Sequence, residues 1–223
     1  MPLSIHPAAR LVVAFLLIRA AVPGLAAQEP ATYTLVISAA GVEVGQEAVR
    51  IGAAGSGLPA TTLSGMARYP AVRARVQLTG TIERSGDGVL TAAQFDVQTP
   101  DHAWRTYVQA SARRLTIRTA TEGQESAREY PFGPRTVVVD DSLFAPWIAV
   151  AALAGERPVV VRAIWPRTGR RGQLTLDRST TPDGGTVVHV SGAASAEIES
   201  QRNGRLARII LPARGLTATV SGP

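Results

Sequence analysis

The sequence predicts a mainly β protein: a large curled antiparallel sheet, or open half-barrel, of about 11–13 strands, packed on one short apolar α-helix. Three observations lead to this prediction. Runs in which apolar and polar residues alternate recur along the chain, turn signals separate them, and one apolar segment has helical character. Of the 223 residues, 45% are hydrophobic and 18% are charged, a balance typical of a domain with its own core.

The clearest predicted strand covers residues 72–83. The residues Val72, Ala74, Val76, Leu78, Gly80 and Ile82 fall on one face, and the intervening polar or charged residues fall on the other. Strict alternation means that one face of the strand is packed and the other is wet, as in an antiparallel sheet. Shorter alternating runs begin near Tyr33, Leu115, Leu174 and Val188.

Turn signals separate these runs. Residues 85–88 read Ser-Gly-Asp-Gly, residues 182–185 read Pro-Asp-Gly-Gly, and Asn203 is followed by Gly204. Asn-Gly and Asp-Gly are strong hairpin signals. Residues 52–57, which read Gly-Ala-Ala-Gly-Ser-Gly, lack the lysine and the following helix of a phosphate loop, so we expect a hairpin tip there.

The single predicted helix begins at Leu143 and ends at Leu153. Asp141 or Ser142 is expected to cap it, Pro146 suits its first turn, and Gly155 follows its end. Apolar residues cover most of its circumference, which is typical of a buried helix. The sheet is the element large enough to bury it.

Residues 1–27 have the pattern of a cleaved secretory signal. Arg10 precedes an apolar run, and small residues allow cleavage after Ala26 or Ala27. Residues 28–223 are then expected to form one β-rich domain, exported to the periplasm or outside the cell. An uncleaved membrane anchor is less well supported, because Arg19 and Pro23 interrupt the apolar stretch.

Composition narrows the classes of function. The chain has no cysteine, which excludes disulfides, thiolate metal sites and the lipid attachment of a bacterial lipoprotein. All basic residues are arginine, and removal of Arg10 and Arg19 leaves 21 arginines against 17 acidic residues, a net charge of +4. The arginines are spread along the chain, with clusters only at residues 113–114 and 167–171, so we expect no nucleic-acid partner.

No motif for catalysis, metal or cofactor binding stands out. His102 is placed in a loop and His189 on the wet face of a strand, without the converging ligands that zinc needs. Asp140 and Asp141 beside Ser142 suggest acid–base or metal chemistry, but neighbouring residues of a strand point to opposite sides, and helix capping explains them more simply. We therefore predict no catalytic residue, no metal and no cofactor.

In outline, residues 33–220 resemble exported bacterial proteins in which one large antiparallel sheet curls around a short apolar helix. The lipoprotein-carrier (Lol) proteins and uncharacterised periplasmic relatives form this group. The resemblance rests on the strand count, the helix beginning at Leu143 and the lead-in at residues 137–140, and no residue motif matches. It implies an apolar concavity, partly plugged by the helix, that binds acyl chains.

The sequence thus favours an exported, non-catalytic protein that binds a lipid or another apolar ligand in the concave face of its sheet. The predicted ligand-binding residues are Leu143, Phe144, Trp147 and Ile148. A wide sheet with one helix to cover it leaves apolar surface for a ligand. Two alternatives remain: a hydrolase-like enzyme using dispersed residues such as Asp140, His102 and arginines, and a passive envelope or protein-interaction module.

Overall fold

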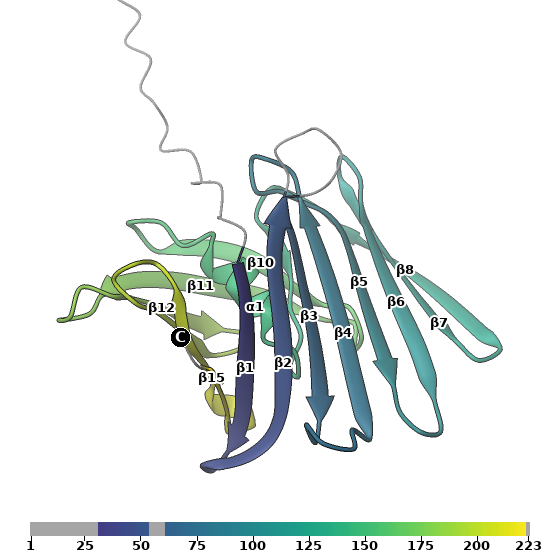
Figure 1. The fold of residues 1–223 in the computed structure, drawn as a ribbon. Coiled ribbons are helices and arrows are strands. Elements are labelled where there is room, and N and C mark those ends of the chain that lie inside the picture. The colour runs from purple at the N-terminus through teal and green to yellow at the C-terminus, as the bar shows by residue number, and fades with distance from the viewer. Residues whose placement is uncertain (1–30, 54–60, 222–223) are drawn as a thin grey trace, which may run out of the picture.

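The computed structural model describes residues 31–53 and 61–221. Within these ranges the chain forms fifteen strands, one α-helix and one 3-10 helix (Figure 1). The elements are β1 (Ala31–Ala39), β2 (Val42–Ala53), β3 (Thr61–Tyr69), β4 (Val76–Arg84), β5 (Leu90–Gln98), β6 (Ala103–Ala110), β7 (Arg114–Thr121), β8 (Gln124–Pro131), β9 (Thr136–Val138), α1 (Ala145–Ala151), β10 (Val159–Trp165), β11 (Arg170–Thr180), β12 (Thr186–Gly192), β13 (Ala196–Ser200), β14 (Leu206–Leu211), η1 (Pro212–Arg214) and β15 (Leu216–Val220).

All fifteen described strands belong to one sheet, in the order β8-β7-β6-β5-β4-β3-β2-β1-β15-β14-β13-β12-β11-β10-β9. The first and last described strands pair antiparallel at its centre, with Leu35 opposite Val220. On one side of this β1–β15 pair, here named the β1–β15 seam, the strands follow in the order β2 to β8. On the other side they follow in the order β14 to β9. The two outermost strands, β8 and β9, share no ladder, so the sheet is curled but open.

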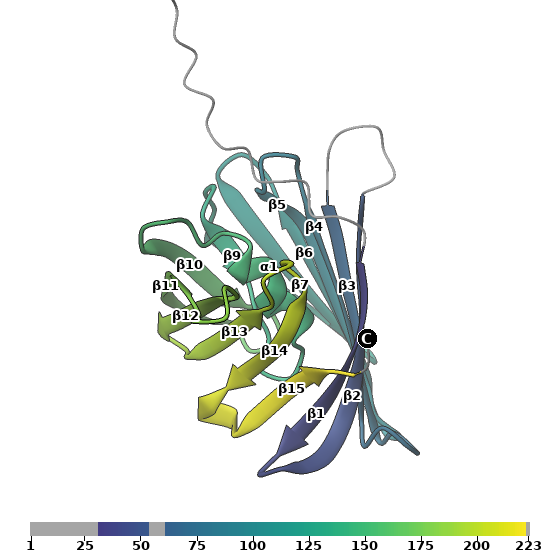
Figure 2. The same ribbon diagram turned by 60° about the vertical axis from the view of Figure 1, so that its left-hand side comes forward.

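One pair of strands departs from the antiparallel pattern. β9 and β10 run parallel, with Ala163 opposite Val137. A parallel neighbour needs a crossover connection, and the segment that contains α1 supplies it. This crossover places α1 on the concave side of the sheet (Figure 2), where it contacts β3 and β4 of one half and β13 of the other.

The core lies on the concave face. Alternate residues of the strands point inward and are buried, among them Leu35, Val49, Phe95, Leu174 and Ile209. Six of the seven residues of α1 are buried as well. The helix thus fills the space between the two halves of the sheet, as expected for a helix that is apolar on all sides.

The predicted fold class is confirmed, with two refinements. There are fifteen described strands rather than 11–13, because short strands such as β9 and β13 carry too few residues to show alternation. The predicted strand at residues 72–83 in fact begins at Val76 and extends to Arg84. Arg73 has a positive φ of 59°, and the Arg75 N–H bonds to the Tyr69 carbonyl, so these residues form a loop and Val72 is exposed.

The predicted turns at residues 85–88, 182–185 and 203–204 are confirmed; Gly88, Gly184 and Gly204 all have positive φ. The expected secretory signal at residues 1–27 lies outside the described residues, as does most of the glycine-rich segment at 52–57. No helix of the described residues is both long and apolar enough to cross a membrane.

Candidate functional site

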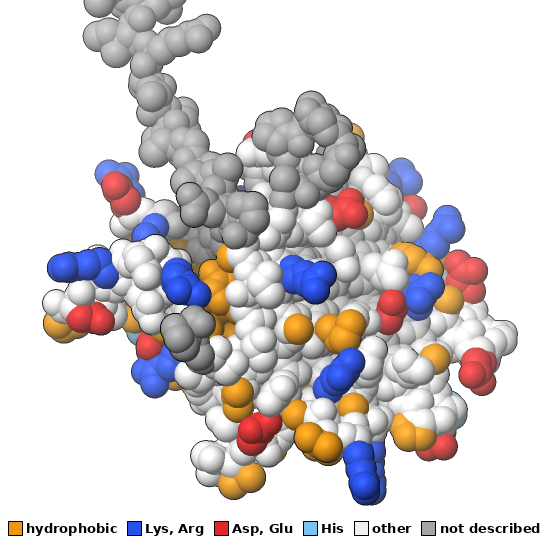
Figure 3. All heavy atoms as spheres, viewed as in Figure 1, with side chains coloured by type: hydrophobic (Ala, Val, Ile, Leu, Met, Phe, Trp, Pro, Cys, Tyr) orange, Lys and Arg blue, Asp and Glu red, His pale blue; other side chains and the backbone are white. Residues whose placement is uncertain are grey.

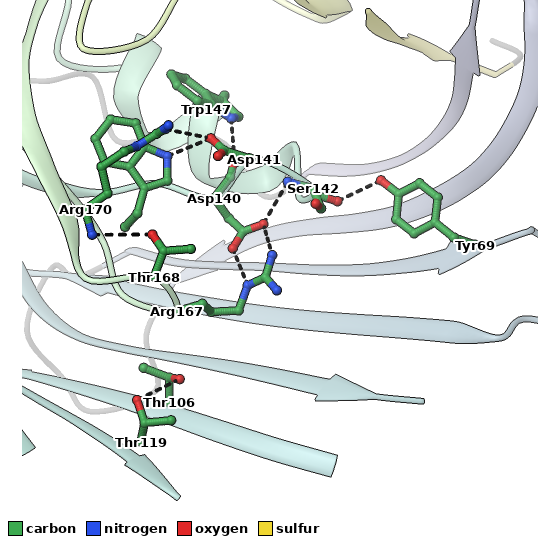
Figure 4. A network of polar contacts seen from close by, with 11 residues as sticks. Tyr69, Thr106, Thr119, Asp140, Asp141, Ser142, Trp147, Arg167, Thr168 and Arg170 are labelled. Atoms are coloured by element: carbon green, nitrogen blue, oxygen red, sulfur yellow. Dashed lines mark hydrogen bonds and ion pairs between the residues drawn. The ribbon is translucent and has the colours of Figure 1, made fainter. Parts of the chain in front are cut away.

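A polar cluster lies at the start of α1, in the loop that connects it to β9 (Figure 4). The loop carries Asp140, Asp141 and Ser142, and its partners come from β3, from β10 and from the turn that follows β10. Sequence-distant elements therefore meet at one end of the helix.

Asp140 is held by Arg167. The guanidinium donates from Nε to Oδ2 at 2.5 Å and from Nη2 to Oδ1 at 2.8 Å, and both side chains are largely buried. Asp140 Oδ1 also accepts the Ser142 N–H at 2.8 Å, and its backbone carbonyl accepts the indole N–H of Trp147 at 2.9 Å. A bidentate pair with these extra bonds satisfies a buried charge, so Asp140 fixes the loop.

Asp141 faces a different set of partners. Its Oδ1 accepts the indole N–H of Trp165 at 2.7 Å and Nη2 of Arg170 at 2.9 Å. The Arg170 guanidinium also lies over the Trp165 ring, with its Cζ 3.8 Å from the ring centre. This stacking on an aromatic face orients Arg170.

The predicted caps of the helix, Asp141 and Ser142, are wrong. The helix begins at Ala145, with Phe144 at the N-cap position and no side-chain bond from that residue. Asp141 is engaged by Trp165 and Arg170, so its carboxylate does not reach the first turn. The predicted end is also too late, because α1 closes at Ala151 and the next residues form turns with carbonyl oxygens of Ile148, Val150 and Ala151.

Glu47 of β2 takes the capping role instead. The Phe144 N–H donates to its Oε2 at 2.7 Å, and the Ala145 N–H donates to its Oε1 at 2.9 Å. These amides are among the free donors of a helix N-terminus. Glu47 is fully buried, and Gly65 on β3 makes room for it: a Cβ at Gly65 would collide with Glu47 Oε1 and lie 2.7 Å from the Ala145 Cβ.

Burial changes the protonation behaviour of two groups here. Removal from water raises the pKa of Glu47 from 4.5 to about 7; the two backbone N–H groups oppose this rise, and the negative charge of Asp140 adds to it. The pKa of Tyr69 is raised well above its usual value, first by burial and then by the charges of Glu47 and Asp140. Its hydroxyl donates to the Ser142 carbonyl at 2.7 Å and is neutral at ordinary pH.

Beside this cluster a pocket of about 220 Å³ opens, here named the Trp147 pocket. Its walls come from the loop before α1, from α1, from the start of β11, from the β12–β13 loop, from the end of β14 and from η1. The lining residues are Asp141, Trp147, Arg170, Ala193, Ala194, Ser195, Leu211, Ala213 and Arg214. The pocket thus combines small and apolar walls with two guanidinium groups and one carboxylate.

The four predicted ligand-binding residues lie together but are covered. Leu143, Phe144, Trp147 and Ile148 are 0%, 0%, 1% and 6% exposed, and they belong to one core with the inner face of the sheet. Of the four, Trp147 lines the pocket. Whether these side chains contact a ligand stays a prediction.

The residues considered for catalysis do not form a recognisable constellation. His102 is exposed in the turn between β5 and β6, where its backbone bonds with Thr99. His189 is exposed on β12, with Nδ1 3.9 Å from Glu197. Within residues 31–53 and 61–221, no group of three or more histidine, aspartate and glutamate side chains has the arrangement of a metal site.

Sequence reasoning missed Glu47, Arg167, Arg170 and Arg214. A signal for Glu47 exists, because it stands two residues before the inward-facing Val49 and so falls in phase with the buried face of β2. Arg167 and Arg170 fall in the arginine cluster at residues 167–171, but the cluster does not show what its side chains contact, and Arg214 stands outside it. Their role depends on how the turn after β10 and the turn before β15 approach the helix.

One solved structure has a similar fold. No protein-family model matches the chain, and no curated protein matches it. Among solved structures, a β-barrel-like protein of the domain-of-unknown-function family DUF1849 from Brucella abortus is similar over 86% of this chain and 95% of its own, with a TM-score of 0.55 and 9% identity. A DUF1089 family protein from Pseudomonas aeruginosa covers 74% of this chain and 88% of its own, with a TM-score of 0.46 and 16% identity.

At such low identity the first of these likenesses shows the fold alone. The chain is therefore a large-sheet protein with a β-barrel-like fold, and its sheet is antiparallel apart from the β9–β10 pair. The resemblance to the lipoprotein-carrier proteins is not shown by these comparisons.

Proposed function

We propose that the protein is an exported binding protein that holds a small amphipathic anion, such as a short fatty acid, in the Trp147 pocket. The observation that carries the proposal is the lining of that pocket, in which two guanidinium groups stand beside apolar walls. Ligand sites typically combine apolar walls with a few placed polar groups.

The charges favour an anion. Asp141 is already engaged by Trp165 and Arg170. Arg214 is exposed and forms no ion pair with the residues that the structure describes. Its guanidinium offers a fork of donors to a carboxylate. Arg170, fixed on Trp165, balances Asp141, so the three charged side chains leave the pocket one net positive charge.

The size of the pocket limits the ligand. A water molecule occupies about 30 Å³ of liquid, so 220 Å³ has room for roughly seven to ten non-hydrogen atoms. Hexanoate falls in this range. A longer acyl chain would need additional space in the core. The side chains proposed to move aside for it are Leu143, Phe144 and Ile148, which lie in the same core as Trp147. The resemblance to the lipoprotein carriers implies such a site for acyl chains.

Titration calorimetry with hexanoate tests the proposal. We expect Arg214→Met and Arg170→Met each to weaken hexanoate binding about 10-fold or more, because a hydrogen bond to a charged group contributes about 1.5–3 kcal/mol. Arg50→Met is the matched control, since Arg50 is an exposed arginine on β2 outside the pocket.

Hexanol and hexylamine test the sign of the charge and should bind more weakly than hexanoate. Equal binding of hexanoate and hexanol, or an equal loss of affinity in the Arg50 control, would rule out recognition of an anion by the Trp147 pocket. Failure of hexanoate to bind the unaltered protein would do the same.

A further inference from the structure

Arg84, the last residue of β4, points into the core rather than outward. The inward face of β4 is marked by Leu78, Gly80 and Ile82, and Arg84 continues their alternation. It is 8% exposed. An arginine on the packed face of a strand is unusual, because this side chain is almost never fully buried unless it is paired.

The inward-facing neighbours of Arg84 that the structure describes are apolar. On β5 it stands opposite Leu90, beside an irregularity in the ladder that brings Leu90 to the packed face. On β3 it stands opposite Thr61. Ile82 and Leu90 are each 2% exposed, and Leu63, the inward neighbour on β3, is 3% exposed. Bulges of this kind are over-represented next to functional sites.

No counter-charge is present for Arg84 among the described residues. It forms none of their ion pairs, its Nε has no hydrogen-bond partner, and the segment at residues 54–60 contains no Asp or Glu. Burial alone lowers the pKa of Arg84 to about 10, so the group is charged at neutral pH. Arg167 differs, since its burial is matched by Asp140.

We propose that Arg84 binds the carboxylate of an apolar molecule, a long-chain fatty acid in particular, at a second site. Among the described residues Arg84 has no counter-charge, and a buried charge without one is strongly unfavourable. A carboxylate pairs with a guanidinium through two parallel hydrogen bonds. A single negative charge balances a single guanidinium, and an alkyl chain suits the leucine and isoleucine neighbours. No residue of β4 lines the Trp147 pocket, so this site is separate from the proposed function.

The Nε–H resonance of Arg84 in a proton–nitrogen correlation spectrum of the full domain provides the test. The resonance is assigned by its loss in Arg84→Met. We expect dodecanoate to shift it in the unaltered protein, and dodecanol and inorganic phosphate to leave it in place. By calorimetry in an Arg214→Met background, in which the Trp147 pocket binds anions weakly, we expect Arg84→Met to weaken dodecanoate binding at least tenfold, whereas Arg50→Met, on the exposed face of β2, leaves it unchanged.

Arg84→Met should unfold at a temperature no lower than that of the unaltered protein, because the variant removes an unpaired buried charge. Arg214→Met separates the two sites: it should weaken hexanoate binding in the Trp147 pocket about 10-fold or more while dodecanoate still shifts the Arg84 resonance. A resonance unmoved by dodecanoate, an equal shift with dodecanol, or a shift with phosphate alone would each overturn the proposal. If Arg84→Met fails to fold, Arg84→Lys, which keeps the charge but lacks the arginine Nε–H, assigns the resonance, and the unaltered protein then decides.

Discussion

Glu47 is the buried acid that links the sheet to the helix. Its carboxylate receives two backbone N–H groups at the start of α1, yet burial raises its pKa to about 7. The two effects act in opposite directions, because the amides favour the charged form and loss of water disfavours it. Loss of water is the larger, so Glu47 binds its proton more tightly in the folded protein than in the unfolded chain.

We predict that stability falls as pH rises between about 4.5 and 7. In this window unfolding releases the proton of Glu47, so the free energy of unfolding decreases with increasing pH. For a shift from 4.5 to about 7, at 1.36 kcal/mol for each pH unit, the full change is about 3 kcal/mol. Urea unfolding at a series of pH values between 4 and 8 measures it.

Glu47→Gln should remove this slope, since glutamine does not titrate. Glu43→Gln, an exposed substitution on the same strand, should keep it. If the two variants show the same dependence on pH as the unaltered protein, Glu47 is not the group responsible.

Helix α1 docks on a platform of small residues. Gly65 of β3 stands opposite Gly80 of β4, and both lie under the helix and its leading loop. A Cβ at Gly80 would lie 3.1 Å from Leu143 Cδ1, and one at Gly65 would meet Glu47 and Ala145. Close approach of helix and sheet, rather than a turn, therefore explains these glycines.

We predict that Gly65→Ala destabilises the protein by about 1–3 kcal/mol, the usual cost of forcing an extra carbon into a packed core. Gly52→Ala on β2 is the matched control, because a Cβ there has no neighbour within 4 Å. Denaturant unfolding compares the two. Similar stability of both variants would mean that the helix does not approach the sheet as closely as described.

The strands of the half-barrel were predictable where apolar and polar residues alternate over a long run, as at residues 76–83. The hairpins were predictable where Asp-Gly or Asn-Gly occurs. The helix was predictable from its apolar composition, but its cap was not. Local rules assign the cap to Asp141 or Ser142, whereas the acceptor, Glu47, lies 97 residues earlier in the chain. The Trp147 pocket could not be predicted either, since turns from separate hairpins form it.

At the scale of the whole molecule, the sheet is two meanders joined at the β1–β15 seam. On the side seen in Figure 3, charged side chains are scattered over the surface, and apolar side chains stand singly or in small groups. Among the described strands, β8 and β9 are consecutive in the sequence but are not neighbours in the sheet. The connection between them joins one edge of the sheet to the other.

We predict that a circular permutant opened between Gly133 and Pro134, with the termini joined by a glycine–serine linker, refolds roughly tenfold faster or more. In that chain all strands adjacent in the sheet are adjacent in sequence, which lowers contact order. A permutant opened at the Asp87–Gly88 turn keeps a distant pairing between β4 and β5 and should gain little. Stopped-flow fluorescence measures both rates; no acceleration specific to the first permutant would contradict this description of the sheet.

The three tryptophans test directly whether the Trp147 pocket binds a small amphipathic anion. Trp147 lines the pocket and Trp165 supports Arg170, whereas Trp104 lies on β6. In a hexanoate titration followed by the indole N–H resonances, the signals of Trp147 and Trp165 should shift together and that of Trp104 should stay in place. Unmoved signals for Trp147 and Trp165 at saturating hexanoate would mean that the Trp147 pocket does not bind the anion.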